Sequence, residues 1–176
     1  GSEMCIRDSH KLDGDLDYRT RNIIKFDEHD SNKIISDVEI SNFIIDNFGL
    51  DQQKSDQISI NDRKFTCKLV SNNILWIEFN DFFRKATGSK DYTYISNKFD
   101  WVFISNFKKN NDDSIDVIRR FISFIDITYT NRTKIKFFFN DIDIENIYTG
   151  SKIENLWVRC KSRLSEMRTQ EYLTNN

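Results

Sequence analysis

The sequence predicts a mixed α/β (α+β) fold, with an antiparallel meander, short helices, a strand–helix–strand crossover and a C-terminal helix. Between Gln57 and Glu78, apolar residues alternate with polar ones, which is typical of half-buried strands. Further along, one long amphipathic pattern separates two short apolar runs, WVFISN (101–106) and KIKFFF (134–139). This order predicts two parallel strands joined by a right-handed crossover.

The first predicted elements precede the meander. Before residue 22 the sequence predicts the end of a strand, a turn at Asp13-Gly14 and a charged extended piece. A helix follows, because Ser36 and Glu39 match the S-x-x-E capping box and Gly49 suits the end of a helix. Its predicted apolar face consists of Val38, Ile40, Ile44, Ile45 and Phe48.

The meander is predicted to contain three antiparallel strands. Asn61-Asp62 and Asn72-Asn73 supply turn residues between them. The inward positions of the first two strands would be Ile58, Ile60, Phe65, Cys67 and Leu69. Two short helices are expected next, DFFRKATG (81–88) and DYTYISNKF (91–99), each with its first Asp as the N-cap.

The last elements are predicted to be helical. The long helix runs through DDSIDVIRRFISFIDITYT (112–130), a short helix covers 141–148, and Gly150 precedes a closing helix. The apolar stripe of that closing helix is Ile153, Leu156, Cys160, Leu164 and Met167. If the helix continues at 100° per residue beyond Met167, Glu171 falls on the same stripe, and Arg163 lies at the border of the stripe. Glu171 must therefore be paired, or the helix must end before it.

Composition bounds the class of protein. The chain has 176 residues, 38% hydrophobic, including fifteen Phe, so we expect one globular domain. The net charge of −2 without a basic segment argues against a dedicated nucleic-acid binder. Such a binder would use Trp76, Tyr92 and Tyr94 as stacking faces. No apolar run is long enough to predict a membrane span, and three scattered Cys with two His predict no metal site.

Two adjacent arginines are the candidate functional residues of the long helix. The sequence lacks the P-loop and the G-x-G-x-x-G loop, so no known nucleotide-binding loop is present. Arg120 lies one turn from Asp116, with which it could form an ion pair. Arg119 shares a narrow polar strip with Ser123 and Asp126. An arginine there can be aimed at a phosphate, or it can simply extend its charged end from the surface.

Six stretches occur in the order and spacing of a known family. They are LDGDLDYRTR, NILWIEFNDFF, KDYTYISNKFDWVFISNF, VIRRFISFIDITYTNRTKIKFFF, NIYTG and VRCKSRLSEMRTQEYL. Together they resemble the region that follows the last core strand in ZapE/Afg-type (AFG-one-like) AAA+ ATPases, over residues 11–173. The sequence departs from the family at three places. It has Asn106-Phe107 where the family has Val-Pro, Thr130 where the family has Asp, and Arg168-Thr169 where the family has Gln-Ser.

The resemblance implies how the chain is organised. Residues 10–176 would be the lid-like C-terminal region of an ATPase, cut just after the core sheet. Gly1-Ser2 looks like a tag scar, and Glu3–Ser9 resembles translated adapter sequence of the kind found in assembled metagenomic DNA. We therefore expect residues 1–9 to be foreign and the natural protein to have begun earlier.

The resemblance also implies site residues and cofactors. Arg119 and Arg120 would be candidate sensor arginines, with Arg19 as a further contact to nucleotide phosphate in the full-length protein. The structural signature of the family falls on Asp17, Tyr18, Arg19, Arg163, Glu166 and Glu171. The family uses ATP and Mg²⁺. Because this chain lacks the Walker A and Walker B motifs, we expect no cofactor and no activity for the fragment alone.

The partners implied by the resemblance are proteins. Bacterial members are linked to cell division and the FtsZ ring, and mitochondrial relatives to membrane-protein quality control. The implied location is the bacterial cytoplasm, including the periphery of the inner membrane. The alternative is a stand-alone protein-interaction module without catalytic activity. An in-frame P-loop upstream of the gene segment would distinguish the two.

Overall fold

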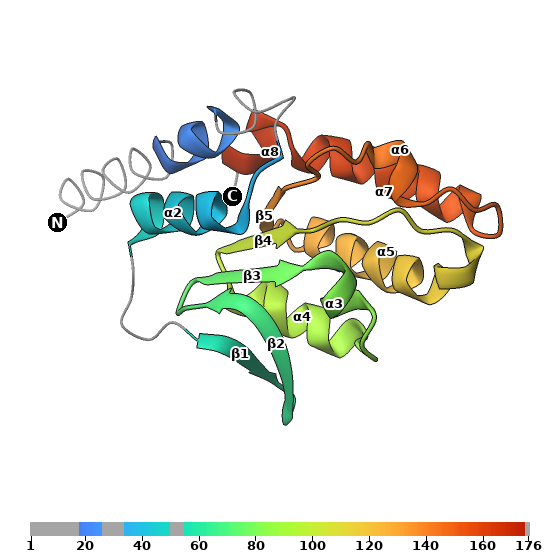
Figure 1. Cartoon of the computed structure of the whole chain (residues 1–176), viewed down its shortest axis with the longest axis horizontal. Helices are drawn as coiled ribbons and strands as arrows, with labels where there is room; N and C mark the ends of the chain where they lie inside the picture. Colours follow the sequence, from blue (N-terminus) through green and yellow to red (C-terminus); the bar gives the residue numbers. More distant parts are fainter. Residues whose placement is uncertain (1–17, 26–33, 50–54, 175–176) are drawn as a thin grey trace, which may run out of the picture.

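The computed structural model of the chain describes residues 18–25, 34–49 and 55–174, which form a mixed α/β fold (Figure 1). Five strands make one sheet in the order β1-β2-β3-β4-β5. Their bounds are Ser55–Ile60, Arg63–Val70, Ile74–Glu78, Trp101–Ser105 and Lys134–Phe137. The first three strands are antiparallel and β3, β4 and β5 are parallel. The predicted fold class is therefore confirmed.

The meander follows the predicted alternation. In β2, the side chains of Phe65, Cys67 and Leu69 are buried, because every second residue of a strand points to the same face. Asn61 and Asp62 both have positive φ, 49° and 65°. A two-residue turn of this kind matches the right-handed twist of the strands that it joins. The turn thereby fixes the register in which Ile60 pairs with Arg63.

The parallel half of the sheet is built from two successive crossovers. The first connects β3 to β4 through α3 (Phe79–Phe83) and α4 (Ser89–Lys98). The second connects β4 to β5 through a 3-10 turn (Asp112–Ser114) and α5 (Ile115–Thr130). All residues of β4 and β5 are buried, as expected for parallel strands with both faces covered.

The sheet lies between helices. Figure 1 shows α4 and α5 together on one side of it and α2 (Asp37–Phe48) on the other. On the side of α2, the ring of Phe48 packs edge-on against Trp101 and Phe103 of β4. On the opposite side, rings from α3, α4 and α5 form one cluster, which includes Phe79, Phe83, Tyr92, Phe121 and Phe124. Helix α7 (Glu154–Met167) packs on α5.

Helix α2 begins as predicted but buries a different set of side chains. Ser36 and Glu39 form the reciprocal capping box, and Gly49 ends the helix with φ 76°. The predicted apolar face was partly wrong. Val38 is 68% exposed, whereas Phe43, which the prediction omitted, is buried. The buried face of α2 therefore consists of Ile40, Phe43 and Ile44, and Val38 points away from it.

Three local predictions were wrong. Residues 18–25 form a helix rather than an extended piece, and the predicted turn at Asp13-Gly14 lies outside the described residues. Asp81 and Asp91 are not N-caps. Asp81 lies inside the first turn of α3, and Asp91 is the third residue of α4, where its carboxylate accepts a hydrogen bond from the amide of Gly88 at 2.9 Å.

The predicted closing helix is two helices. Helix α7 ends at Met167 and α8 covers Gln170–Thr174. The hydroxyl of Thr169 donates to the carbonyl of Glu166 at 2.7 Å and accepts from the amide of Tyr172 at 3.2 Å. A Thr side chain that satisfies a free first-turn amide is a strong N-cap, so it favours a new helix at this point.

The carboxylate of Asp112 holds the segment before α7 in place. It accepts hydrogen bonds from the Tyr148 hydroxyl and from the amides of Ser151 and Lys152. The hydrogen bond from Tyr148, followed by those from the backbone, holds the pKa of Asp112 below its usual range. The segment starts just after α6 (Ile144–Ile147) and approaches Asp112 closely at Gly150.

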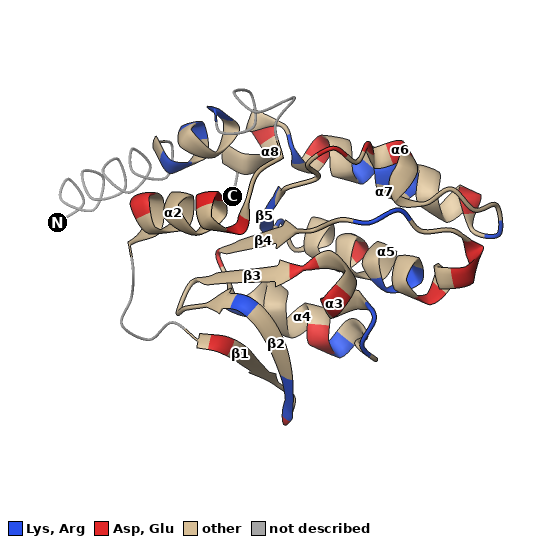
Figure 2. Cartoon of the chain, in the orientation of Figure 1, with Lys and Arg blue, Asp and Glu red and all other residues tan. Residues whose placement is uncertain are grey.

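Charged residues of both signs are spread over the outer faces of the helices (Figure 2). No helix within the described ranges is long and apolar enough to cross a membrane.

Candidate functional site

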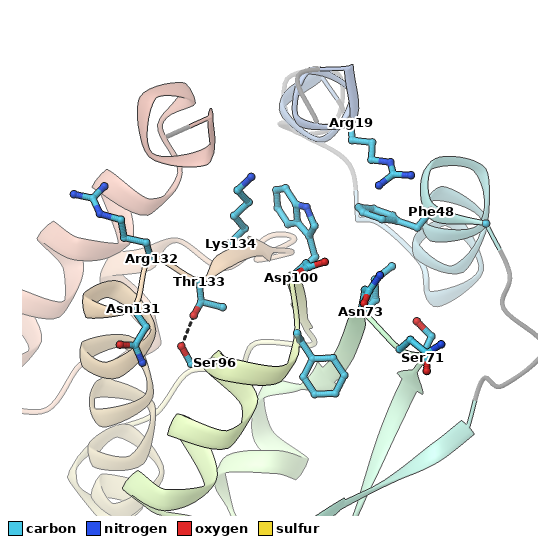
Figure 3. A pocket seen from close by; sticks show the side chains of 15 residues that line it. Arg19, Phe48, Ser71, Asn73, Ser96, Asp100, Asn131, Arg132, Thr133 and Lys134 are labelled. Atoms are coloured by element: carbon cyan, nitrogen blue, oxygen red, sulfur yellow. Dashed lines mark hydrogen bonds between the residues drawn. The ribbon is translucent and has the colours of Figure 1, made fainter. Parts of the chain in front are cut away.

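A hollow lies at the amino ends of the three parallel strands, and we call it the amino-edge pocket (Figure 3). Its volume is about 530 Å³, which is within the range of small-ligand and peptide sites. Its lining residues come from the helix over 18–25, the end of α2, the β2–β3 turn, the segment from α4 to β4 and the α5–β5 turn. They are Arg19, Phe48, Gly49, Ser71, Asn72, Asn73, Ile74, Ser96, Phe99, Asp100, Trp101, Asn131, Arg132, Thr133 and Lys134.

Lys134 is the most unusual of these side chains. It starts β5 and is only 6% exposed, with its ammonium 5.8 Å from the centroid of the Trp101 ring. Burial lowers the pKa of Lys134, and the carboxylate of Asp100 opposes that effect. Within the described part of the chain, the Lys134 ammonium forms no ion pair. The ring face is thus its main stabilising contact.

The α5–β5 turn presents Arg132 beside Lys134. Arg132 has φ 56°, and the turn is closed by hydrogen bonds from the amides of Arg132 and Thr133 to the carbonyls of Tyr129 and Thr128. The Thr133 hydroxyl forms a hydrogen bond with that of Ser96 at 2.6 Å. Arg132 is exposed, so a hydrogen-bonded turn places a cation at the rim of the pocket.

Arg19 lies on the opposite rim. Its guanidinium is 5.4 Å from the ring centroid of Phe48, and Figure 3 shows Lys134 between Arg19 and Arg132. The helix that carries Arg19 is joined to α2 by a hydrogen bond from Asn22 to Asn47 at 2.8 Å. Among the predicted site residues that the structure describes, Arg19 is the one that borders this pocket.

The two arginines predicted on α5 lie elsewhere and apart. Arg119 is exposed and borders a second hollow with residues 151–156. Arg120 donates to the carbonyls of Phe83 at 3.0 Å and Arg84 at 3.4 Å. The sequence had suggested an ion pair between Arg120 and Asp116, and the structure has these contacts to carbonyl groups instead. Arg19, Arg119 and Arg120 therefore border three separate cavities.

Two of the six predicted signature residues, Arg163 and Glu166, join α5 to α7. Arg163 pairs with Asp126, which also accepts from Arg159 at 3.3 Å. The Tyr129 hydroxyl donates to the Glu166 carboxylate at 2.6 Å. The guanidinium of Arg163 lies 5.1 Å from the Tyr129 ring centroid.

The other signature residues do not belong to this contact. Glu171 is exposed on α8, because α7 ends at Met167, so the second of the two alternatives for Glu171, that the helix ends before it, is the one that the structure has. Tyr18 is 66% exposed, and Asp17 lies outside the described residues.

A pair of substitutions tests this placement. We expect Asp126→Ala to lower the free energy of unfolding by about 1 kcal/mol, because two arginines lose their acceptor while their partial exposure screens the loss. Glu171→Ala is expected to change it by less than about 0.5 kcal/mol. Urea denaturation followed by circular dichroism measures both. A larger loss for Glu171→Ala than for Asp126→Ala would contradict the structure.

Sequence reasoning missed Lys134, Arg132 and Trp101 as members of one site. The weak signal was N-R-T-K (131–134), a basic turn between a helix and a buried strand. Reasoning also offered Trp76 and Tyr92 as stacking faces for nucleic acid, but both are buried, at 3% and 0% exposure. Among the described residues, no three His, Cys, Asp or Glu side chains gather to hold a metal ion.

Comparison with known proteins identifies a family model and related sequences that match this chain. A family model described as AFG1-like ATPase matches residues 6–176. An uncharacterized protein of Schizosaccharomyces pombe is 24% identical over 151 residues, covering 70% of this chain and 33% of that protein. Cell division protein ZapE of Escherichia coli K12 is 28% identical over 122 residues, covering 69% of this chain and 32% of ZapE. The chain thus spans about a third of the length of these relatives. No solved structure matches it.

Proposed function

Because this chain belongs to the AFG1-like ATPase family, we propose that it is the C-terminal region of an ATPase that couples ATP hydrolysis to the remodelling of protein partners. The observation that carries the proposal is the family match, which extends over residues 6–176. The Escherichia coli relative is named a cell division protein. We therefore propose a division protein of the FtsZ type, or a membrane-protein substrate, as the partner, and the bacterial cytoplasm or the inner-membrane periphery as the location.

The residues of this chain do not fit an ATP–Mg²⁺ site by themselves. The sequence has no P-loop, the motif whose backbone amides cradle phosphates. Within the described ranges, no cluster of three acidic or imidazole side chains could hold the metal. ATP and Mg²⁺ would be bound by a nucleotide-binding core outside this sequence, and the 176-residue chain alone is expected to be inactive.

Of the two sensor candidates, Arg119 suits contact with such a core better. It is exposed, and among the described residues its guanidinium has no hydrogen bond or ion pair. Arg120 already uses its guanidinium on the carbonyls of Phe83 and Arg84, so it stabilises the fold. A planar, permanently charged fork that is otherwise unoccupied is suited to a phosphate oxygen.

The test places this chain back in a full-length ATPase and measures steady-state ATP turnover. Arg119→Ala is expected to lower kcat by about tenfold or more, because a transition-state contact is lost. Arg84→Ala is the matched control, since Arg84 is exposed on a neighbouring surface, and its turnover should not change. Arg120→Ala is expected mainly to lower the free energy of unfolding, because Arg120 donates to the carbonyls of Phe83 and Arg84, and to change the turnover of the folded enzyme less than Arg119→Ala does. Unchanged turnover in both Arg119→Ala and Arg120→Ala would refute the sensor role.

A further inference from the structure

We propose that the amino-edge pocket docks an acidic peptide segment of a protein partner. The inference rests on the proposed function only in taking a protein as the ligand. Its support comes from the charge of the pocket, the directions of its cations and the ammonium of Lys134, which forms no ion pair with any residue that the structure describes.

The first support is charge. Three cationic residues line the pocket, Arg19, Arg132 and Lys134, against one carboxylate, Asp100. Figure 2 shows basic residues on both the helix over 18–25 and β5, the elements on either side of the hollow. The whole chain has a net charge of −2, so this local excess of positive charge runs against the overall balance. It favours an anionic ligand through electrostatic complementarity.

The second support is the direction of the cations. Figure 3 shows Arg132 and Arg19 on opposite sides of the hollow, with Lys134 between them. Arg19 and Lys134 already lie over the rings of Phe48 and Trp101. A single phosphate group is usually held by donors that converge on it. Separated cations instead match carboxylates spaced along an extended chain.

The third support is Lys134. Its side chain is almost fully buried, yet its ammonium lacks an ion-pair partner among the described residues. A buried cation is costly unless an anion or a polar group accompanies it. A carboxylate entering the pocket would provide that partner while the lysine stem remains packed.

Polar groups in the pocket suit a peptide backbone as well. Figure 3 shows the side chains of Asn73 and Asn131 on different walls, with Ser71 and Ser96 nearby. Amide side chains can both donate to and accept from a peptide main chain. The pocket can therefore bind carboxylates at its rim and hydrogen-bond the segment that carries them.

The test measures fluorescence anisotropy of labelled probes with the 176-residue chain, at low ionic strength and without ATP. The main probe is an octapeptide that alternates Glu with Leu. We expect it to bind, and the double variant Arg132→Gln/Lys134→Met to weaken binding by about tenfold. The double variant Arg84→Gln/Lys64→Met removes the same number of charges at two exposed positions outside the pocket. It should change the affinity by less than about twofold.

Two further probes identify the ligand class. An octapeptide that alternates Lys with Leu should not bind, and an octathymidine oligonucleotide should bind more weakly than the acidic peptide. If the Lys134 variant unfolds, Arg132→Glu, at an exposed turn residue, takes its place and should weaken binding at least as much. Failure of the acidic peptide to bind, equal binding by the double variant, or tighter binding of the oligonucleotide would overturn the proposal. Because no ATP is used, these results are independent of the turnover test of Arg119.

Discussion

Replacing Gly150 by alanine is expected to lower the free energy of unfolding by about 3 kcal/mol. A Cβ at this position would lie 2.2 Å from the Oδ1 atom of Asp112 and 2.6 Å from the Tyr148 ring. Neither neighbour can easily give way. The Asp112 carboxylate is held by the amides of Ser151 and Lys152 and by the Tyr148 hydroxyl. The added methyl group must therefore break this contact or shift the segment that leads into α7.

Gly88→Ala is the matched control for this experiment. A Cβ on Gly88 would meet nothing within 4 Å, so only the change of N-cap residue before α4 matters. We expect a loss of about 1 kcal/mol or less. Urea denaturation of both variants gives the comparison, and a loss at Gly150 no larger than that at Gly88 would show that the close approach at Asp112 is relaxed in solution.

Phe83→Ala is expected to have the largest effect of any single substitution proposed for the chain, about 4 kcal/mol. The ring of Phe83 is fully buried. It contacts five other rings at centroid distances of 5.1–6.2 Å, those of Phe79, Phe82, Tyr92, Phe121 and Phe124. Small domains are stable by only about 5–15 kcal/mol, so this cavity should remove a large fraction of the stability.

Phe139→Ala provides the comparison for Phe83. Phe139 also packs against other rings, tilted against Phe107 and stacked on Phe137, but it is only partly buried. Because water can reach the space left by its truncation, we expect a loss of about half that of Phe83→Ala. Thermal and urea unfolding would measure both, and the reverse order would contradict the assignment of Phe83 to the centre of the core.

Much of the fold was accessible from the sequence, because local patterns determine it. The alternation in β2 and the turn at Asn61-Asp62 specify a hairpin without help from distant residues. The apolar face of α5 likewise predicts a buried helix. The sequence left the end of α7 open, because the stripe meets the charged Glu171 beyond Met167 and only tertiary packing decides whether that carboxylate is paired or the helix ends, as it does before Thr169. The helix over 18–25 depends on its contact with α2, which no local pattern reveals.

The amino-edge pocket could not be predicted in the same way. Its cations are more than 100 residues apart in sequence, at Arg19 and at Arg132 and Lys134. Only the parallel arrangement of β3, β4 and β5 brings the amino ends of these strands, and the turns before them, to one edge of the sheet. Arg120 shows the converse. Its place on the helix was correct, but its partners on the α3 segment depend on tertiary packing.

The attachment of α8 to the α5–β5 turn has an evolutionary consequence. The Tyr172 hydroxyl donates to the main-chain carbonyl of Thr133 at 2.8 Å and lies 3.5 Å from that of Thr128. Mutation cannot delete a main-chain acceptor, whereas a single nucleotide change can delete the phenol donor. Selection to keep this turn in place should therefore conserve the tyrosine at position 172. The residue types at positions 128 and 133 can vary more freely, limited only by the packing of their own side chains.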